Sequence, residues 1–159
     1  MTRNQLVKSI QQSFSGICRP DDKYITLNKG DDIWVESFLG GSENSWTEIN
    51  SNKIEHENSA LSCVRPQAYA YYLAAYLTWS LRNYETSEST TVDNIIYSLN
   101  SCSYDSITKL RLEKNYKTLN LIQSKSVLNY LKYMASLSNE IVESEAAQKA
   151  IDCYWHKYA

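Results

Sequence analysis

The chain has 159 residues, which is the usual size of one domain. Apolar residues make up 43% and charged residues 21%, so the chain can bury a core, and wholesale disorder is not expected. It holds only four glycines and two prolines, whereas β-sandwiches and barrels use these residues at most turns. This shortage favours an all-α protein, and the net charge of −2 by itself indicates no nucleic-acid or membrane partner.

The first residues lack the long apolar stretch of a secretory signal, and the longest uncharged run, residues 66–81, is too short to span a bilayer. Four cysteines lie far apart without paired spacing: Cys18, Cys63, Cys102 and Cys153. Without an export signal, reduced thiols are the default. We therefore expect a cytoplasmic protein with free cysteines.

The first third of the chain predicts one clear helix and several short elements. A helix from Thr2 ends near Gly16 and Pro20, and its core stripe is Leu6, Val7, Ile10, Phe14 and Ile17. Residues 18–30 are predicted as a loop. Asp31 and Asp32 could cap a short helix over residues 31–39, which the pair Gly40-Gly41 would end. A short turn or helix around Trp46 and Ile49 and an exposed polar stretch over 50–59 would follow.

The strongest pattern in the sequence is a helix over residues 66–83. Pro66 occupies the first helical position, which suits its fixed φ and missing N–H. One stripe is apolar throughout, and the other faces are mostly apolar as well: Tyr69, Tyr72, Leu73, Tyr76, Leu77 and Leu81, with Ala70, Tyr71, Ala74, Ala75 and Trp79. A helix that is apolar nearly all round is expected at the centre of the fold.

The rest of the chain predicts four shorter amphipathic helices. The first covers residues 93–99, and Thr108 is expected to cap the second. Ser124 or Ser126 should open the third, and Asn139 the last, whose first turns carry Glu140, Glu143 and Glu145. The sequence thus predicts a single compact helical domain over residues 1–159. It would contain about seven helices around the central helix at 66–83.

The charges are segregated along the chain. Residues 105–132 carry six bases against two acids, whereas residues 21–60 carry three lysines against nine acids: Asp21, Asp22, Asp31, Asp32, Glu36, Glu43, Glu48, Glu55 and Glu57. Two solvated surfaces would explain this pattern. An acidic face that docks a basic protein would explain it too, because such a face steers encounter and fixes register.

Aromatic residues within the acidic segment favour the second explanation. Tyr24, Trp34 and Trp46 lie among the carboxylates, and tyrosine and tryptophan are typical interface anchors. The two tryptophans could equally attach short helices to the core. The predicted partner-binding set is Asp21, Asp22, Asp31, Asp32, Trp34, Glu36, Glu43, Trp46, Glu48, Glu55 and Glu57.

No catalytic, metal or cofactor motif stands out. His56-Glu57 begins like a helical zinc motif, but Ala60 stands where the second histidine would be. Cys153 and His156 supply two possible ligands, whereas a structural zinc site requires four. There is no phosphate-binding glycine loop, and a catalytic triad is not expected with two histidines. The tyrosines within the basic stretch 109–132 sit at core spacing, so we expect packing there and not nucleic-acid binding.

Several patterns together resemble an uncharacterised family of small bacterial proteins, a domain of unknown function. They are Phe-Leu-Gly-Gly at 38–41, Trp46-x-Glu48-Ile49, and Pro-x-Ala-x-x-Tyr-Tyr-Leu-x-Ala-Tyr-Leu from Pro66 to Leu77. The end of the chain, from Ala146 to Trp155, is similar to that family's closing helix. The resemblance is best over residues 38–99 and weaker over 100–140. It implies no activity and no catalytic residue.

These observations predict a non-enzymatic protein-binding protein. The specific hypothesis is an immunity protein or antitoxin-like inhibitor that neutralises a cognate basic toxin, such as a nuclease, through the acidic face. A small hydrolase or metal enzyme is the first alternative, and it would gather acids with His56 or His156 in a cleft. A homo-oligomeric scaffold is the second, and it would expose an apolar patch through Trp155 and Tyr158.

Overall fold

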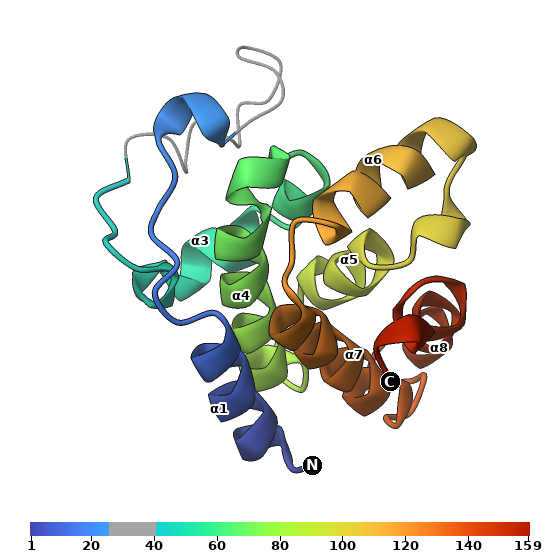
Figure 1. The fold of residues 1–159 in the computed structure, drawn as a ribbon. Coiled ribbons are helices and arrows are strands. Elements are labelled where there is room, and N and C mark those ends of the chain that lie inside the picture. Colours follow the sequence, from blue (N-terminus) through green and yellow to red (C-terminus); the bar gives the residue numbers. More distant parts are fainter. Residues whose placement is uncertain (26–40) are drawn as a thin grey trace.

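The computed structural model describes residues 1–25 and 41–159, and these residues fold into α-helices joined by short 3₁₀ turns (Figure 1). The all-α expectation is confirmed, since the described part holds no β-strand beyond an isolated bridge between Cys18 and Ser45. The α-helices of this part are α1 (Arg3–Ser13), α3 (Ser51–His56), α4 (Pro66–Asn83), α5 (Thr91–Ser98), α6 (Ser106–Tyr116), α7 (Leu121–Ala135) and α8 (Ser144–Cys153).

Helix α4 lies at the centre of the fold, as the sequence predicts. It begins with Pro66 at the first helical position, and its side chains from Tyr71 to Leu81 are all buried. It contacts α1, α3, α5 and α6, while α7 packs against α1 and α8 (Figure 1). Burial on every side explains why the helix shows no polar face over this stretch.

Helix α1 agrees with its predicted start and ends earlier than predicted. Thr2 is the N-cap, and it exchanges reciprocal hydrogen bonds with Gln5 in a capping box. The helix ends at Ser13, and the chain turns at Gly16, whose φ of +76° is readily adopted only by glycine. Ile17 therefore lies past the helix, where it packs half-buried against the core.

Two predicted helix starts are wrong because stronger caps precede them. Asp105, not Thr108, caps α6, since its carboxylate accepts the backbone N–H groups of Ile107 and Thr108. Asn120 caps α7 through a capping box with Gln123, so that helix begins before the predicted Ser124 or Ser126. Both serines are buried inside the helix. The first turns of both helices expose apolar residues such as Ile107 and Leu121, so the apolar pattern does not mark where the helices begin.

The last helix also begins later than predicted. Residues 136–143 form turns, and α8 begins at Ser144 with Glu143 as its N-cap. Asn139 lies outside the helix, where its side-chain oxygen accepts the hydroxyl of Ser144 and the N–H of Glu145. Glu145 alone of the three predicted acids therefore lies in the first turn of α8.

The stretch 50–59 is not the exposed polar segment that the sequence indicates. Asn50 caps the short helix α3, and Ile54 on that helix is buried in the core. The turn around Trp46 is present as the 3₁₀ turn Trp46–Glu48. The predicted helix at 31–39 and its stop at Gly40 lie outside the described residues.

The cysteine prediction is wrong for two of the four residues. Cys102, which follows α5, forms a disulfide with Cys153 at the end of α8, and their Cα atoms are 6.2 Å apart. Cys18 and Cys63 are not disulfide-bonded. The disulfide joins positions 51 residues apart in sequence, a spacing that no local motif reveals. Among the described helices, none is long and apolar enough to cross a membrane.

Candidate functional site

The predicted acidic residues fall on two loops and one short helix. Asp21 and Asp22 lie in the exposed turn before Ile25, and Glu48 is exposed on the turn that contains Trp46. The bridge between Cys18 and Ser45 brings these two loops side by side. Asp31, Asp32, Trp34 and Glu36 lie outside the described residues.

Basic partners already compensate part of this acidic surface. Arg19 pairs with Asp22 at 2.8 Å, and Lys53 pairs with Glu43 at 3.5 Å. Nearby, burial raises the pKa of Tyr71 to about 12, and the charge of Glu43 adds to that shift. The loops therefore form a mixed surface, in which Asp22 and Glu43 are paired while Asp21 and Glu48 are exposed.

Trp46 is part of the core. Only 4% of it is exposed, and its indole N–H donates to the carbonyl of Phe14 at 3.0 Å. Of the two uses that the sequence allowed for this tryptophan, the structure shows the attachment of a short turn to the core. Trp46 thus positions the acidic loop and does not present its ring to solvent.

Helix α3 lies between two concave regions, and different side chains of the helix line each of them. Ser51 and Ile54 face α4, while Asn52, Glu55 and His56 face the segment that follows α4. Within each set, residues three or four positions apart lie on the same face of a helix, so the two sets mark two faces of α3. The outer face lines a hollow of about 770 Å³, which we name the α3 hollow and which is lined by Asn52, Glu55, His56, Asn58, Thr86, Glu88 and Ser89.

The α3 hollow is polar throughout and carries two carboxylates. Neither lysine nor arginine occurs among its lining residues. Ser87 donates to Glu55 at 2.8 Å, whereas Glu88 is exposed and forms no ion pair within the described part of the chain. A site with this lining attracts a cationic group, because neither carboxylate forms an ion pair with the residues that the structure describes.

Two hydrogen bonds fix the backbone at the α3 hollow. The hydroxyl of Thr91 donates to the carbonyl of Glu55 at 2.8 Å, and the buried hydroxyl of Tyr76 donates to the carbonyl of Glu57 at 2.6 Å. Burial raises the pKa of Tyr76 well above its ordinary value, so this donor keeps its proton. Glu57 itself is only 9% exposed, which removes it from the predicted binding surface.

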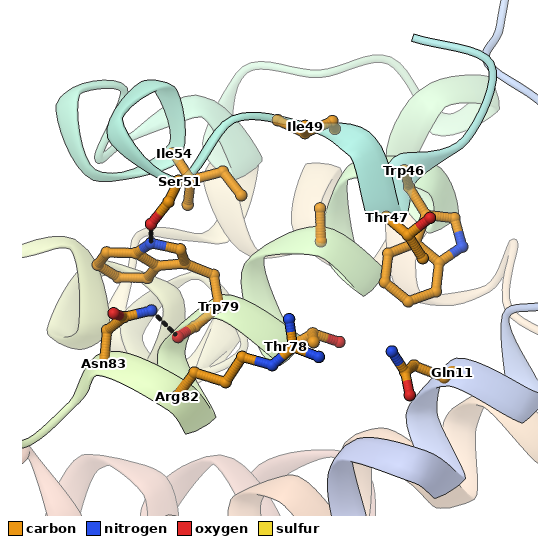
Figure 2. Close-up of a pocket in the computed structure, with 11 residues that line it drawn as sticks. Gln11, Trp46, Thr47, Ile49, Ser51, Ile54, Thr78, Trp79, Arg82 and Asn83 are labelled. Atoms are coloured by element: carbon orange, nitrogen blue, oxygen red, sulfur yellow. Dashed lines mark hydrogen bonds between the residues drawn. The ribbon is translucent and has the colours of Figure 1, made fainter.

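The inner face of α3 lines a second cavity, which we name the α4 pocket. It has a volume of about 300 Å³ and is lined by Gln11, Trp46, Thr47, Ile49, Ser51, Ile54, Ala75, Thr78, Trp79, Arg82 and Asn83. Figure 2 shows Trp79 held by Ser51 on one side, while Arg82 and Gln11 reach toward the opening from α4 and α1. The indole N–H of Trp79 donates to the Ser51 hydroxyl at 2.7 Å.

The remaining predictions about chemistry can be compared with the described residues. They contain no group of three or more histidine, cysteine, aspartate or glutamate residues placed to hold a metal ion. Cys153 is bonded to Cys102, so it is not available as a ligand beside His156. In the basic stretch, Tyr116 and Tyr130 are fully buried, which agrees with the packing role expected for them.

The apolar patch expected for an oligomeric scaffold is not at the predicted place. Trp155 is completely buried, and its indole N–H donates to the carbonyl of Leu99 at 2.9 Å. Of the eight large exposed apolar side chains among the described residues, four lie on α6 and on the first turn of α7: Ile107, Leu110, Leu121 and Ile122.

Sequence reasoning missed the residues that complete both concave regions. Glu88 lies outside the acidic segment and reaches the α3 hollow only because the chain returns past α3 after α4. Arg82 and Thr78 appear in the sequence as ordinary members of a buried helix. The one available signal was a polar threonine and an arginine within a mostly apolar helical run.

A protein-family model described as a family of unknown function (DUF6714) matches residues 2–159. The chain belongs to this family, in agreement with the uncharacterised family that its sequence resembles. Searches of curated proteins and of solved structures found no significant match.

Proposed function

We propose that this chain is a non-enzymatic protein-binding protein, an immunity-protein or antitoxin-like inhibitor that neutralises a basic toxin domain. The observation that carries the proposal is the α3 hollow. It places the carboxylates of Glu55 and Glu88 in one concave, wholly polar region without a lysine or arginine. A lysine or arginine side chain from a partner supplies the missing positive charge, and such charge pairs fix the register of a complex.

The acidic loops beside α3 extend this surface. Asp21 and Glu48 are exposed, and Glu43 is linked to α3 through Lys53. Carboxylates on several elements attract a broad basic surface and raise the rate of encounter. A nuclease domain presents such a surface because it must bind phosphates, and an acidic protein that covers it blocks the active site.

The test is a paired capture experiment with the full chain. Tagged wild-type protein and the double variant Glu55→Gln/Glu88→Gln are used to capture partners from the native host, and Glu140→Gln/Glu145→Gln serves as a control with the same charge change. We expect wild type and control to retain a basic protein that the α3 double variant retains about tenfold less. Equal capture by all three proteins would contradict a binding role for the hollow.

The inhibitor role has its own readout. Expression of the captured partner alone should arrest growth, and co-expression with wild type should restore it, whereas co-expression with the α3 double variant should restore it poorly. A partner that is harmless by itself would contradict the toxin hypothesis while leaving protein binding in place.

A second candidate function uses the same hollow. It gathers His56 with Glu55 and Glu88, which is the grouping expected for a small hydrolase. Ester and phosphodiester substrates assayed with wild type and His56→Ala distinguish the two functions. A hydrolase loses its turnover in this variant, whereas a protein-binding surface shows no turnover in either form.

The cellular compartment belongs to the same proposal. We propose the cytoplasm as the compartment of such an inhibitor, in line with the expectation from the sequence. The disulfide opposes this placement, since stable disulfides are typical of oxidising compartments. Alkylation of thiols at the moment of cell lysis decides between them: four reactive thiols support the cytoplasm, and two support an oxidising compartment.

A further inference from the structure

We propose that the α4 pocket is a binding site for a small organic anion with an aromatic or short aliphatic body. The body lies against Trp79 and Ile54, and the carboxylate or phosphate group pairs with Arg82. This site and the α3 hollow are lined by different side chains of α3, so the inference does not rest on the proposed function.

The walls of the pocket are held in place before any ligand binds. The indole N–H groups of Trp79 and Trp46 are both used, the first by the Ser51 hydroxyl and the second by the Phe14 carbonyl. The Asn83 amide donates to the carbonyl of Trp79 at 2.8 Å (Figure 2). Rigid walls lower the entropy cost of binding, as in most preformed ligand sites.

The polar side chains of Arg82 and Gln11 line this cavity, and a buried hydroxyl belongs to one of its lining residues. Thr78 is 4% exposed, and its buried hydroxyl forms no hydrogen bond within the described structure. Burying a hydroxyl without a partner costs about 1–3 kcal/mol, so such groups call for an explanation. Thr78 and Arg82 lie four residues apart on α4, and both line the pocket together with Gln11 of α1 (Figure 2). The Thr78 hydroxyl is itself out of reach of solvent, so the polar groups that a ligand can contact are the guanidinium of Arg82 and the amide of Gln11.

The charge around the opening is positive. None of the residues that line the α4 pocket is acidic, and Arg82 is exposed and forms no ion pair in residues 1–25 and 41–159. Arg82 and Gln11 also line an adjacent hollow of about 380 Å³, together with Arg3, Asn4, Val7, Lys8 and Leu81. Arg3 forms an ion pair with Glu85 at 2.6 Å, so the cations that can attract an anion to this hollow are Lys8 and Arg82.

The two regions together specify an amphipathic ligand. The α4 pocket provides indole and aliphatic surface, and the adjacent hollow provides cations at its edge. A volume of about 300 Å³ is at the lower end of the range for ligand sites. It suits one ring or a short branched chain and is small for a nucleotide or a long acyl chain.

The experiment uses the full chain and four defined probes in isothermal titration calorimetry. 3-Phenylpropionate and phenyl phosphate carry both required features, 3-phenylpropionamide lacks the charge, and inorganic phosphate lacks the body. We expect at least one of the aromatic anions to bind at millimolar concentration and the amide to bind about tenfold more weakly. The carboxylate and the phosphate ester differ in affinity according to the natural head group. No binding of either anion, or equal binding of the amide, overturns the proposal.

Three variants locate the site. Arg82→Gln should weaken the binding of the aromatic anion about tenfold or more, because the substitution removes a charged donor. Thr78→Val, which keeps the shape of the side chain and removes only an inaccessible hydroxyl, should bind the aromatic anion like wild type. Lys125→Gln on α7 removes the same charge away from the pocket and should bind like wild type. Unchanged affinity in Arg82→Gln, with its circular dichroism spectrum like that of wild type, overturns the proposal.

Discussion

The two sides of α4 are stabilised in different ways. On the α6–α8 side, the Cys102–Cys153 disulfide and a cluster of tilted and edge-to-face rings fix the structure, with the ring centres of Tyr116 and Trp155 4.8 Å apart. On the α3 side, a six-residue helix is attached by Ile54 and a few hydrogen bonds, and both the α4 pocket and the α3 hollow lie there. Binding elements are commonly drawn from the less stable parts of a fold. The comparison teaches that the covalently braced side supports the fold, while the less braced side provides the concave surfaces.

Breaking the disulfide should produce the largest change in stability. Cys102 is exposed, so Cys102→Ser removes the bond with little loss of packing. For a loop of 51 residues, the chain-entropy relation gives a loss of about 4 kcal/mol in the free energy of unfolding. Urea denaturation measures it, and a reducing agent should lower wild type to the level of the variant. If anion binding at the α4 pocket weakened as well, the two sides would not be independent.

Removing the main apolar anchor of α3 should have the next largest effect. Ile54 is 3% exposed, and Ile54→Ala should cost about 3 kcal/mol through lost burial and the cavity left behind. Glu55→Ala on the outer face of the same helix serves as the control and should cost less than about 1 kcal/mol. Urea denaturation of both variants tests the assignment of the two faces. Equal losses would show that α3 has no distinct inner face.

Matched tyrosine substitutions compare the two sides directly. Tyr76 donates to the carbonyl of Glu57 beside α3, and Tyr116 donates to the carbonyl of Ser98 at 2.7 Å on the other side. Tyr76→Phe and Tyr116→Phe should each cost about 1 kcal/mol. Hydrogen exchange should separate them, because Tyr76→Phe accelerates exchange in α3 and leaves α8 protected. Uniform acceleration in both variants would mean that the two sides open together.

The smallest expected effect is a pH dependence on the braced side. Burial raises the pKa of Asp93 above its ordinary value, while the N–H of Glu143 donates to it and offsets part of the shift. The folded state therefore holds this proton more tightly than the unfolded state, so its contribution to stability is present in acid. It is lost as the pH rises from about 4 through the raised pKa.

Asp93→Asn tests the sign of this dependence. The variant keeps an acceptor for Glu143 and removes the titrating group, so its stability relative to wild type should improve between acidic and neutral pH. Because the carboxyl is partly solvated, the gain should stay below about 1 kcal/mol. Urea denaturation at several pH values measures it. A relative loss toward neutral pH would contradict the assigned direction.

The local elements that the sequence predicted correctly carry their signals in neighbouring residues. Pro66 and the apolar run after it specify α4, and Thr2 with Gln5 specifies the start of α1. The starts of α6 and α7 were missed although Asp105 and Asn120 are strong caps. In both helices the first turn exposes apolar residues such as Ile107 and Leu121, so the apolar pattern did not mark the true boundary.

The candidate sites were less predictable because their residues meet only in space. Glu55 was identified from the acidic segment, but its neighbour Glu88 belongs to a polar linker after α4. The α4 pocket combines Gln11 of α1, Ser51 of α3 and Arg82 of α4, and no short motif links these positions. Trp46 shows the reverse case, since a residue predicted to face a partner lies in the core.

The sequence by itself determined the helical class, the family and the central position of α4, because helical periodicity and caps act over a few residues. Only the tertiary structure decided that Cys102 reaches Cys153 and that α3 divides a carboxylate-lined hollow from a pocket edged by arginine. The physical reason is that burial, pairing and cavity shape depend on contacts between distant segments. The sequence of residues 21–60 shows how many acidic side chains the segment has. Packing decides which of them form ion pairs, as Asp22 and Glu43 do.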